Sequence, residues 1–96
     1  MYYETWILPV EGDVGYIESL SMSGFVLGAW NDSTTAGTKV DLEMKKEPIS
    51  EGQKWIKGKS NSNGWFTLTN PNSGKTLQYE WDFTSNKEQA TIEGKL

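Results

Sequence analysis

The amino-acid sequence predicts an all-β domain, and three observations support this prediction. Apolar residues almost never recur at helical spacing. The apolar segments are short and rich in β-branched and aromatic residues. Gly, Asn, Asp and Ser separate them, which is typical of the turns of a β-sandwich or barrel. A chain of 96 residues is expected to form one domain, spanning residues 1–96.

Eight strands are expected along the chain. In order, they lie near Trp6–Pro9, Tyr16–Leu20, Phe25–Ala29, Lys39–Met44, Lys54–Lys57, Trp65–Thr69, Thr76–Trp81 and Ala90–Glu93. The least regular segment is Thr84–Gln89, whose polar residues are also compatible with a helical turn. The pattern therefore favours antiparallel strands joined by short connections.

The predicted turns are defined by residues that adopt positive φ at low cost. Glu11–Asp13 and Ser62–Gly64 are expected to form hairpin-type turns. Met22–Gly24 and Asn72–Gly74 are expected to be tight turns that end on glycine. Two longer polar loops are expected at residues 31–38 and 45–52.

Composition excludes several classes of function. The chain has no Cys and no His, so disulfides, thiol chemistry, His-based catalysis and the usual zinc sites are not expected. Thirteen acidic residues always allow some carboxylate pair, and no motif surrounds Asp13, Asp41 or Asp82. No glycine-rich phosphate loop precedes a helix. We therefore expect no enzyme activity, no metal and no cofactor.

Charge and hydropathy limit the expected partners. The net charge is −4 and every basic residue is Lys, so nucleic acid is not an expected partner. The longest apolar run, Phe25–Trp30, is far shorter than the ~20 residues of a membrane span. The first residues do not resemble a signal peptide. The compartment stays open; it would be the cytoplasm if the chain is complete.

An internal duplication with a spacing of about 50 residues runs along the chain. The matched pairs are Trp6 with Trp55, Gly15-Tyr16-Ile17 with Gly64-Trp65-Phe66, Ser23-Gly24 with Ser73-Gly74, Leu27 with Leu77, Trp30 with Trp81, and Leu42 with Ile92. Pro71 is the expected site of a one-residue insertion. The pattern predicts two four-strand units, covering about residues 1–51 and 52–96.

These motifs resemble the ricin B-type lectins, the β-trefoil family with Gln-x-Trp repeats. The resemblance rests on the two Ser-Gly turns with their following leucines, on Ser33–Val40, and on Gln53-Lys54-Trp55. It implies a β-trefoil-like fold in which Trp55 packs into a shared core and Gln53 bonds within its repeat. Family members have three units, whereas this chain holds two. The chain is then a fragment, a small barrel closed on two units, or a barrel completed by self-association, and we expect a homo-oligomer.

The resemblance also implies a sugar site, which neither unit retains in full. In the first unit the sugar-binding Asp position is Gly28, the third-strand positions are Asp41 and Glu43, and the Asn-Gln pair is Gly52-Gln53. In the second unit the corresponding residues are Gln78, Thr91 and Glu93. Asp41, Gln53 and Gln78 are therefore candidate polar ligands.

A displaced sugar site is an alternative, because an indole stands beside amide and carboxylate groups in both units. Trp30-Asn31-Asp32 and Trp81-Asp82 are expected at equivalent loop starts. Sugars need one aromatic face and a few aimed polar groups. The expected function is non-catalytic carbohydrate binding, as a lectin or carbohydrate-binding module. The alternative is a protein-interaction or inhibitor module on a trefoil that has lost its sugar pocket. The ligand-binding candidates are Trp30, Asn31, Asp41, Gln53, Gln78, Trp81 and Asp82.

Overall fold

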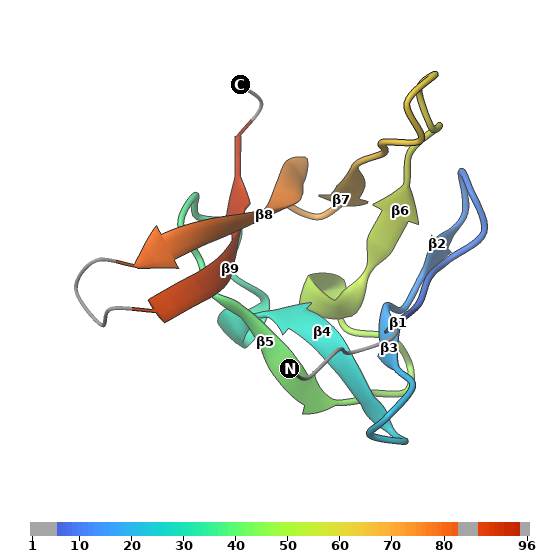
Figure 1. Ribbon diagram of the computed structural model, residues 1–96. Coiled ribbons are helices and arrows are strands. Elements are labelled where there is room, and N and C mark those ends of the chain that lie inside the picture. The colour runs from blue at the N-terminus through green and yellow to red at the C-terminus, as the bar shows by residue number, and fades with distance from the viewer. Residues whose placement is uncertain (1–5, 83–86, 95–96) are drawn as a thin grey trace.

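The computed structural model describes the backbone of residues 6–82 and 87–94, and the side chains of residues 6–78 and 90–94 (Figure 1). This part of the chain contains nine strands, two short 3-10 helices and no α-helix. All strand pairs in it are antiparallel. The radius of gyration is 13.0 Å, as a compact domain of this size has. The predicted all-β class is confirmed.

The first sheet has four strands in the order β1-β3-β4-β5. Its members are β1 (Trp6–Ile7), β3 (Glu18–Ser19), β4 (Phe25–Ala29) and β5 (Val40–Met44). The β4–β5 ladder runs from the Phe25–Met44 pair to the Ala29–Val40 pair. The 3-10 helix η1 (Trp30–Asp32) follows at the end of β4, so this ladder ends where the loop of residues 30–39 begins.

The second sheet has five strands in the order β2-β6-β7-β8-β9. Its members are β2 (Val14–Gly15), β6 (Trp55–Lys57), β7 (Leu68–Asn70), β8 (Lys75–Asp82) and β9 (Lys87–Glu93), with η2 (Glu51–Gln53) before β6. The sheets meet where Lys39 bridges Thr91. There the Ile92 amide donates to the Thr38 carbonyl at 3.0 Å, and the Gly37 amide donates to the Ile92 carbonyl at 2.8 Å.

The expected strands match the structure except at two places. β2 was not expected as a separate strand. The strand predicted for Trp65–Thr69 instead begins at Leu68, because the backbone of Trp65 belongs to a turn. The Trp65 amide donates to Asn61 Oδ1 at 3.1 Å, and the Trp65 carbonyl accepts from the Asn61 amide at 2.9 Å. Of the irregular segment Thr84–Gln89, residues 87–89 belong to β9 and residues 84–86 lie outside the described part.

The two halves of the chain share one pairing scheme. The order β1-β3-β4-β5 in the first half corresponds to β6-β7-β8-β9 in the second. The equivalent pairs are Leu27–Leu42 with Leu77–Ile92, and Glu18–Val26 with Thr69–Thr76. The strand ends are capped alike as well. Ser19 Oγ accepts from the Met22 amide at 3.0 Å, and Asn70 Oδ1 accepts from the Ser73 amide at 3.0 Å.

This register corrects part of the predicted alignment. If Ser19 corresponds to Asn70, Ile17 corresponds to Leu68 and not to Phe66. Burial agrees, because Ile17 is a core residue and Leu68 packs against the same core, whereas Phe66 is exposed. The turn after Ser19 is one residue longer than the turn after Asn70, so the extra residue lies in the first half and not at Pro71.

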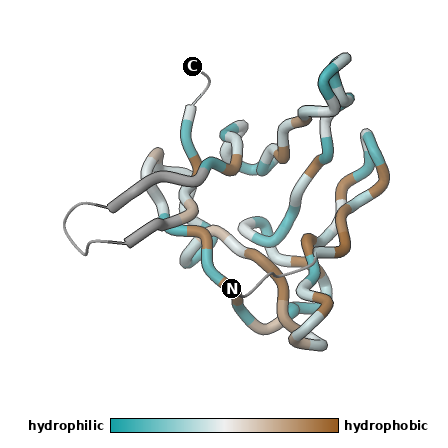
Figure 2. The backbone as a smooth tube through the Cα atoms, viewed as in Figure 1, coloured by the Kyte–Doolittle hydropathy of each residue, from teal (hydrophilic) through white to brown (hydrophobic). Residues whose placement is uncertain are grey.

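Both halves contribute to the core. Its buried cluster consists of Ile17, Ala29, Val40, Trp55 and Ile92, and Trp6, Leu8, Leu27, Leu68, Leu77 and Ala90 pack against it. Figure 2 shows hydrophobic stretches in strands of both sheets, while the tip of the β6–β7 connection is hydrophilic. Trp55 is fully buried and its Nε1 donates to the Leu27 carbonyl at 3.0 Å. Trp6 is only half-buried, since among the described strands β1 has one neighbour whereas β6 has two.

Candidate functional site

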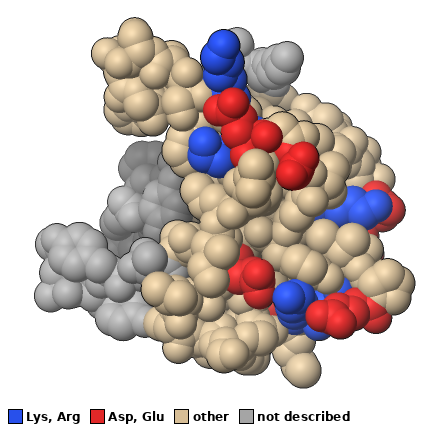
Figure 3. Space-filling view, turned by 90° about the vertical axis from the view of Figure 1, so that its right-hand side faces the viewer, with Lys and Arg blue, Asp and Glu red and all other residues tan. Residues whose placement is uncertain are grey.

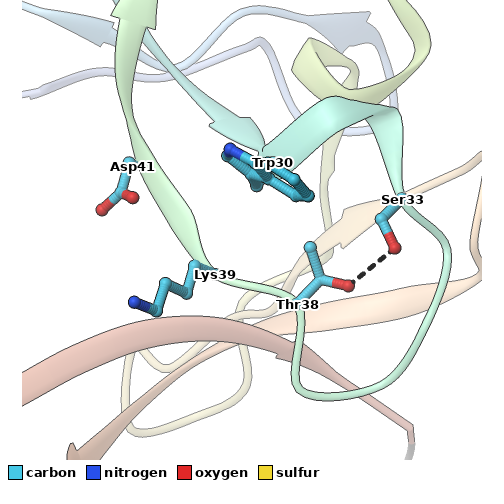
Figure 4. Close-up of a pocket in the computed structure, with 5 residues that line it drawn as sticks. All are labelled: Trp30, Ser33, Thr38, Lys39 and Asp41. Atoms are coloured by element: carbon cyan, nitrogen blue, oxygen red, sulfur yellow. Dashed lines mark hydrogen bonds between the residues drawn. The ribbon is translucent and has the colours of Figure 1, made fainter.

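A depression of about 520 Å³ lies between η1 and the start of β5 (Figure 4). Its lining residues are Trp30, Ser33, Thr38, Lys39 and Asp41. This volume falls within the range of small-molecule sites. The residues come from both ends of one loop and from the strand that follows it, so a single loop positions most of the site.

The base of the loop is closed by main-chain and hydroxyl hydrogen bonds. The Trp30 amide donates to the Lys39 carbonyl at 2.9 Å, and the Ser33 amide donates to the Trp30 carbonyl at 3.0 Å. Thr38 Oγ1 lies 2.9 Å from Ser33 Oγ and 2.6 Å from the Thr35 carbonyl (Figure 4). The hydroxyls of Ser33 and Thr38 therefore shape the loop as well as line the depression.

A second set of contacts attaches the loop to η2. Asn31 and Asp32 both have positive φ, 54° and 53°, a conformation that Asn and Asp tolerate better than most residues. It brings Asp32 Oδ1 to 2.7 Å from the Gly52 amide, which donates to it. Gly52 is buried there, and a Cβ on it would lie 2.7 Å from the Ala29 carbonyl oxygen. The turn that carries Trp30 is thus held both by the hydrogen bonds at the base of its own loop and by the contact with η2.

The depression presents one aromatic face and several polar groups. The side chain of Trp30 is 65% exposed although it belongs to a loop fixed at its base. Lys39 and Asp41 are two residues apart along an extended segment, so they project from the same face of it. Both are exposed. An indole beside an ammonium, a carboxylate and two hydroxyls can stack on an apolar ring face while its neighbours accept and donate hydrogen bonds.

Of the predicted site residues, Trp30 and Asp41 come together in this depression. Asn31 adjoins it in η1, with an exposed side chain. Gln53 lies elsewhere and is fully buried. Its Nε2 donates to Glu43 Oε1 at 2.8 Å and to the Met44 carbonyl at 2.9 Å, and its Oε1 accepts from the Lys46 amide at 3.0 Å.

Of the first-unit positions that the resemblance assigned to a sugar pocket, Asp41 lines the depression. The other four, Gly28, Glu43, Gly52 and Gln53, pack against neighbouring protein groups. The Glu43 carboxylate lies over Gly28, so that a Cβ on Gly28 would overlap it. Gln53 Nε2 holds this carboxylate in place. Gly28 and Gly52 are both buried. A glycine at position 28 therefore makes room for Glu43.

The second half does not repeat the arrangement around Trp30. β4 ends at Ala29 and Trp30 begins a turn, whereas β8 continues through Trp81 and Asp82, which pair with Glu88 and Lys87. The expected equivalence of the two loop starts is therefore wrong, because the β8–β9 ladder is longer than the β4–β5 ladder. The side chains of Trp81 and Asp82 lie outside the described part.

The last predicted site residue, Gln78, lies on β8 away from the Trp30 loop. It is half-buried, and its Nε2 donates to Thr76 Oγ1 at 3.3 Å. Its backbone pairs with Thr91, whose own hydroxyl donates to Glu93 Oε2 at 2.7 Å. Gln78 is thus one strand beyond the bridge between Thr91 and Lys39.

Sequence reasoning missed three residues that line the depression, Ser33, Thr38 and Lys39. Lys39 could have been found from the sequence, because it stands two residues before the predicted Asp41 and so projects from the same face of the strand. Ser33 and Thr38 carry no comparable signal, since their approach depends on how the loop closes.

The wider surface shows mixed charge. On the face drawn in Figure 3, acidic and basic side chains lie beside one another and form no patch of one sign. Lys45 Nζ lies 3.2 Å from Glu18 Oε1, and Lys54 Nζ lies 2.8 Å from Glu51 Oε1. Among the described residues, no group of three or more His, Cys, Asp or Glu is placed to hold a metal ion. None of the helices described is long and apolar enough to cross a membrane.

No family model, curated protein or solved structure matches this chain.

Proposed function

We propose that the chain is a non-catalytic carbohydrate-binding domain whose site is the depression beside Trp30. The observation that supports this most is the combination of a 65% exposed indole with the polar groups of Lys39 and Asp41 around one depression. We also propose that the shared pairing scheme of the two halves reflects a trefoil-related arrangement of two units.

The chemistry of sugars fits this site. One face of a pyranose ring is largely C–H and stacks on an aromatic ring, while its hydroxyls need both donors and acceptors. Asp41 accepts, Lys39 donates, and the Ser33 hydroxyl does either. Thr38 Oγ1 donates its proton to the Thr35 carbonyl, so towards a ligand it accepts. Because Trp30, Lys39 and Asp41 are exposed and one loop supplies most of the lining, we expect weak binding. The dissociation constant for a monosaccharide should lie in the millimolar range, about −4 kcal/mol.

Binding is tested by titrating sugars while tryptophan fluorescence is recorded, after a glycan array has identified a responding ligand. Trp30→Ala should abolish the response, and Asp41→Asn should weaken it about tenfold through loss of a charged acceptor. Trp65→Ala is the matched control, since Trp65 is a similarly exposed indole, 75% exposed, outside the depression. Retention of full affinity by Trp30→Ala would refute the proposed site.

A protein-interaction module is the second candidate, and the position of Glu43 favours it. Its carboxylate lies over Gly28 and is held by Gln53, in the place where the resemblance implies a sugar pocket. A trefoil-related domain whose pocket is filled in this way is suited to contacts with a protein through its loops. An unresponsive glycan array together with one tight protein partner would establish this candidate in place of the first.

A further inference from the structure

Two segments, β1 and residues 65–66, each have an edge that no other described strand pairs with. β6 lies between β2 and β7 and pairs with both. In the other half its counterpart is β1, with Trp6 and Ile7 in the places of Trp55 and Ile56. Among the described residues β1 pairs with β3 only. Within the part of the chain that the structure describes, the outer edge of β1 therefore has no strand of the β2 kind beside it.

The main-chain groups of Trp6 face this outer edge. The Ile17 carbonyl accepts from the Leu27 amide at 3.0 Å, so Ile17 directs its main-chain groups towards β4. Directions alternate along a strand, so Glu18 exchanges hydrogen bonds with its opposite residue in β1, Ile7. Trp6 then directs its amide and carbonyl away from β3.

Residues 65–66 form the complementary edge. Asn70 corresponds to Ser19. Trp65 and Phe66 stand before Asn70 at the same sequence spacing as Val14 and Gly15 of β2 stand before Ser19. Residues 65–66 are therefore the counterpart of β2 in the second half. Trp65 is bonded to Asn61 within its turn. The main-chain groups of Phe66 have no hydrogen-bond partner among the described residues, and no ladder described here pairs residues 65–66 with a β6-like strand.

We propose that β1 of one copy of the chain pairs antiparallel with residues 65–66 of a second copy. The β2–β6 ladder, in which Gly15 is opposite Trp55 and Val14 opposite Ile56, fixes the register. It places Trp6 opposite Phe66 as the hydrogen-bonded pair. Ile7 and Trp65 then form the non-hydrogen-bonded pair, whose side chains approach most closely.

Exposed apolar side chains lie at both edges. Ile7 is 48% exposed, Trp65 75% and Phe66 38%. Exposed edges with apolar side chains recruit further strands, and the proposed pairing covers all three residues together. The two edges do not pair with each other within the chain, whereas a second copy supplies the missing partner of each. Such a head-to-tail contact closes into a ring or extends into a chain of copies.

Disulfide trapping tests the register, because the chain has no Cys of its own. Equal amounts of the single variants Ile7→Cys and Trp65→Cys are mixed at a concentration more than tenfold above that at which the parent associates, because Trp65→Cys removes the same indole as Trp65→Ser. The mixture is oxidised, and the mixed disulfide is identified by mass spectrometry. The 7–65 product should exceed, several-fold, the 7–44 product formed with Met44→Cys. Met44 is 71% exposed on β5 and serves as the control for random collision. A 7–65 yield no higher than the 7–44 yield overturns the proposal.

Light scattering supplies a second readout that does not involve cysteine. The parent chain should associate as its concentration rises, and Trp65→Ser should weaken association about tenfold or more, as removal of a central aromatic anchor does. Met44→Ser should leave it unchanged. A parent that stays monomeric at every concentration, or an unchanged association of Trp65→Ser, refutes the contact. Sugar binding at Trp30 is a separate measurement, so either proposal fails without the other.

Discussion

Replacement of Gly52 by alanine probes the contact that attaches the Trp30 loop to η2. A Cβ at this position would lie 2.6 Å from Asp32 Oδ1, 2.7 Å from the Ala29 carbonyl oxygen and 3.0 Å from the Asp32 Cα. The last two atoms belong to the backbone and cannot rotate away. The methyl group must therefore displace either η2 or the η1 turn, and the Gly52–Asp32 hydrogen bond is strained as well.

Overpacking of this kind costs about 1–3 kcal/mol of unfolding free energy. In a domain of this size 1 kcal/mol corresponds to a change in Tm of roughly 4–8 °C. A cost of about 2 kcal/mol thus predicts that Gly52→Ala melts roughly 8–16 °C below the parent. Thermal unfolding followed by tryptophan fluorescence measures this difference.

Gly94→Ala is the matched control, because a Cβ at Gly94 would meet no described atom within 4 Å apart from its chain neighbours. It should melt within about 2 °C of the parent, as most surface substitutions away from special features do. If Gly52→Ala were as stable as Gly94→Ala, the close packing of η2 against the loop would be refuted. The explanation of why a glycine stands at position 52 would then fail too.

Substitutions at two further residues test hydrogen bonds in the same region. Gln53→Ala removes the three hydrogen bonds of a buried side chain and leaves the Lys46 amide and the Met44 carbonyl without these partners, so it should cost at least about 2 kcal/mol. Urea unfolding measures this, and a midpoint equal to that of the parent would contradict it. Asp32→Ala should cost about 1.5–3 kcal/mol because the Gly52 amide loses its charged acceptor, while Asp32→Asn keeps an acceptor and tolerates positive φ. Equal unfolding free energies for these two variants would show that the bond is unimportant.

Local chemistry explains which parts of the fold the sequence predicts well. The strand Phe25–Ala29 has the expected bounds, since a short apolar segment between turn residues determines it. Gly24 and Gly74 end their turns with φ of 84° and 70°, as turns that finish on glycine require. Residues that are neighbours in the sequence determine such features, so they can be predicted without a tertiary structure.

The sequence alignment of the two halves predicted part of the observed strand pairing. The pairs Leu27–Leu42 and Leu77–Ile92 occupy equivalent places in the two halves. The alignment of Phe66 with Ile17 was wrong. The Trp65 amide donates to Asn61 Oδ1 within a turn, and β7 begins only at Leu68. This turn is held by hydrogen bonds from the Asn63 and Trp65 amides to Asn61 Oδ1 and from the Asn61 amide to the Trp65 carbonyl, and residue types alone did not indicate them.

The sequence by itself determined the all-β class and the positions of the tight turns. It also marked Trp30-Asn31-Asp32 as a candidate group of an indole with an amide and a carboxylate. Only the tertiary structure decided that Glu43 fills the space above Gly28 and that Lys39 and Asp41 join Trp30 around one depression. The physical reason is the separation along the sequence of the residues that interact. Turns and strand periodicity depend on residues a few positions apart, whereas these contacts depend on how ladders and loops distant along the chain align.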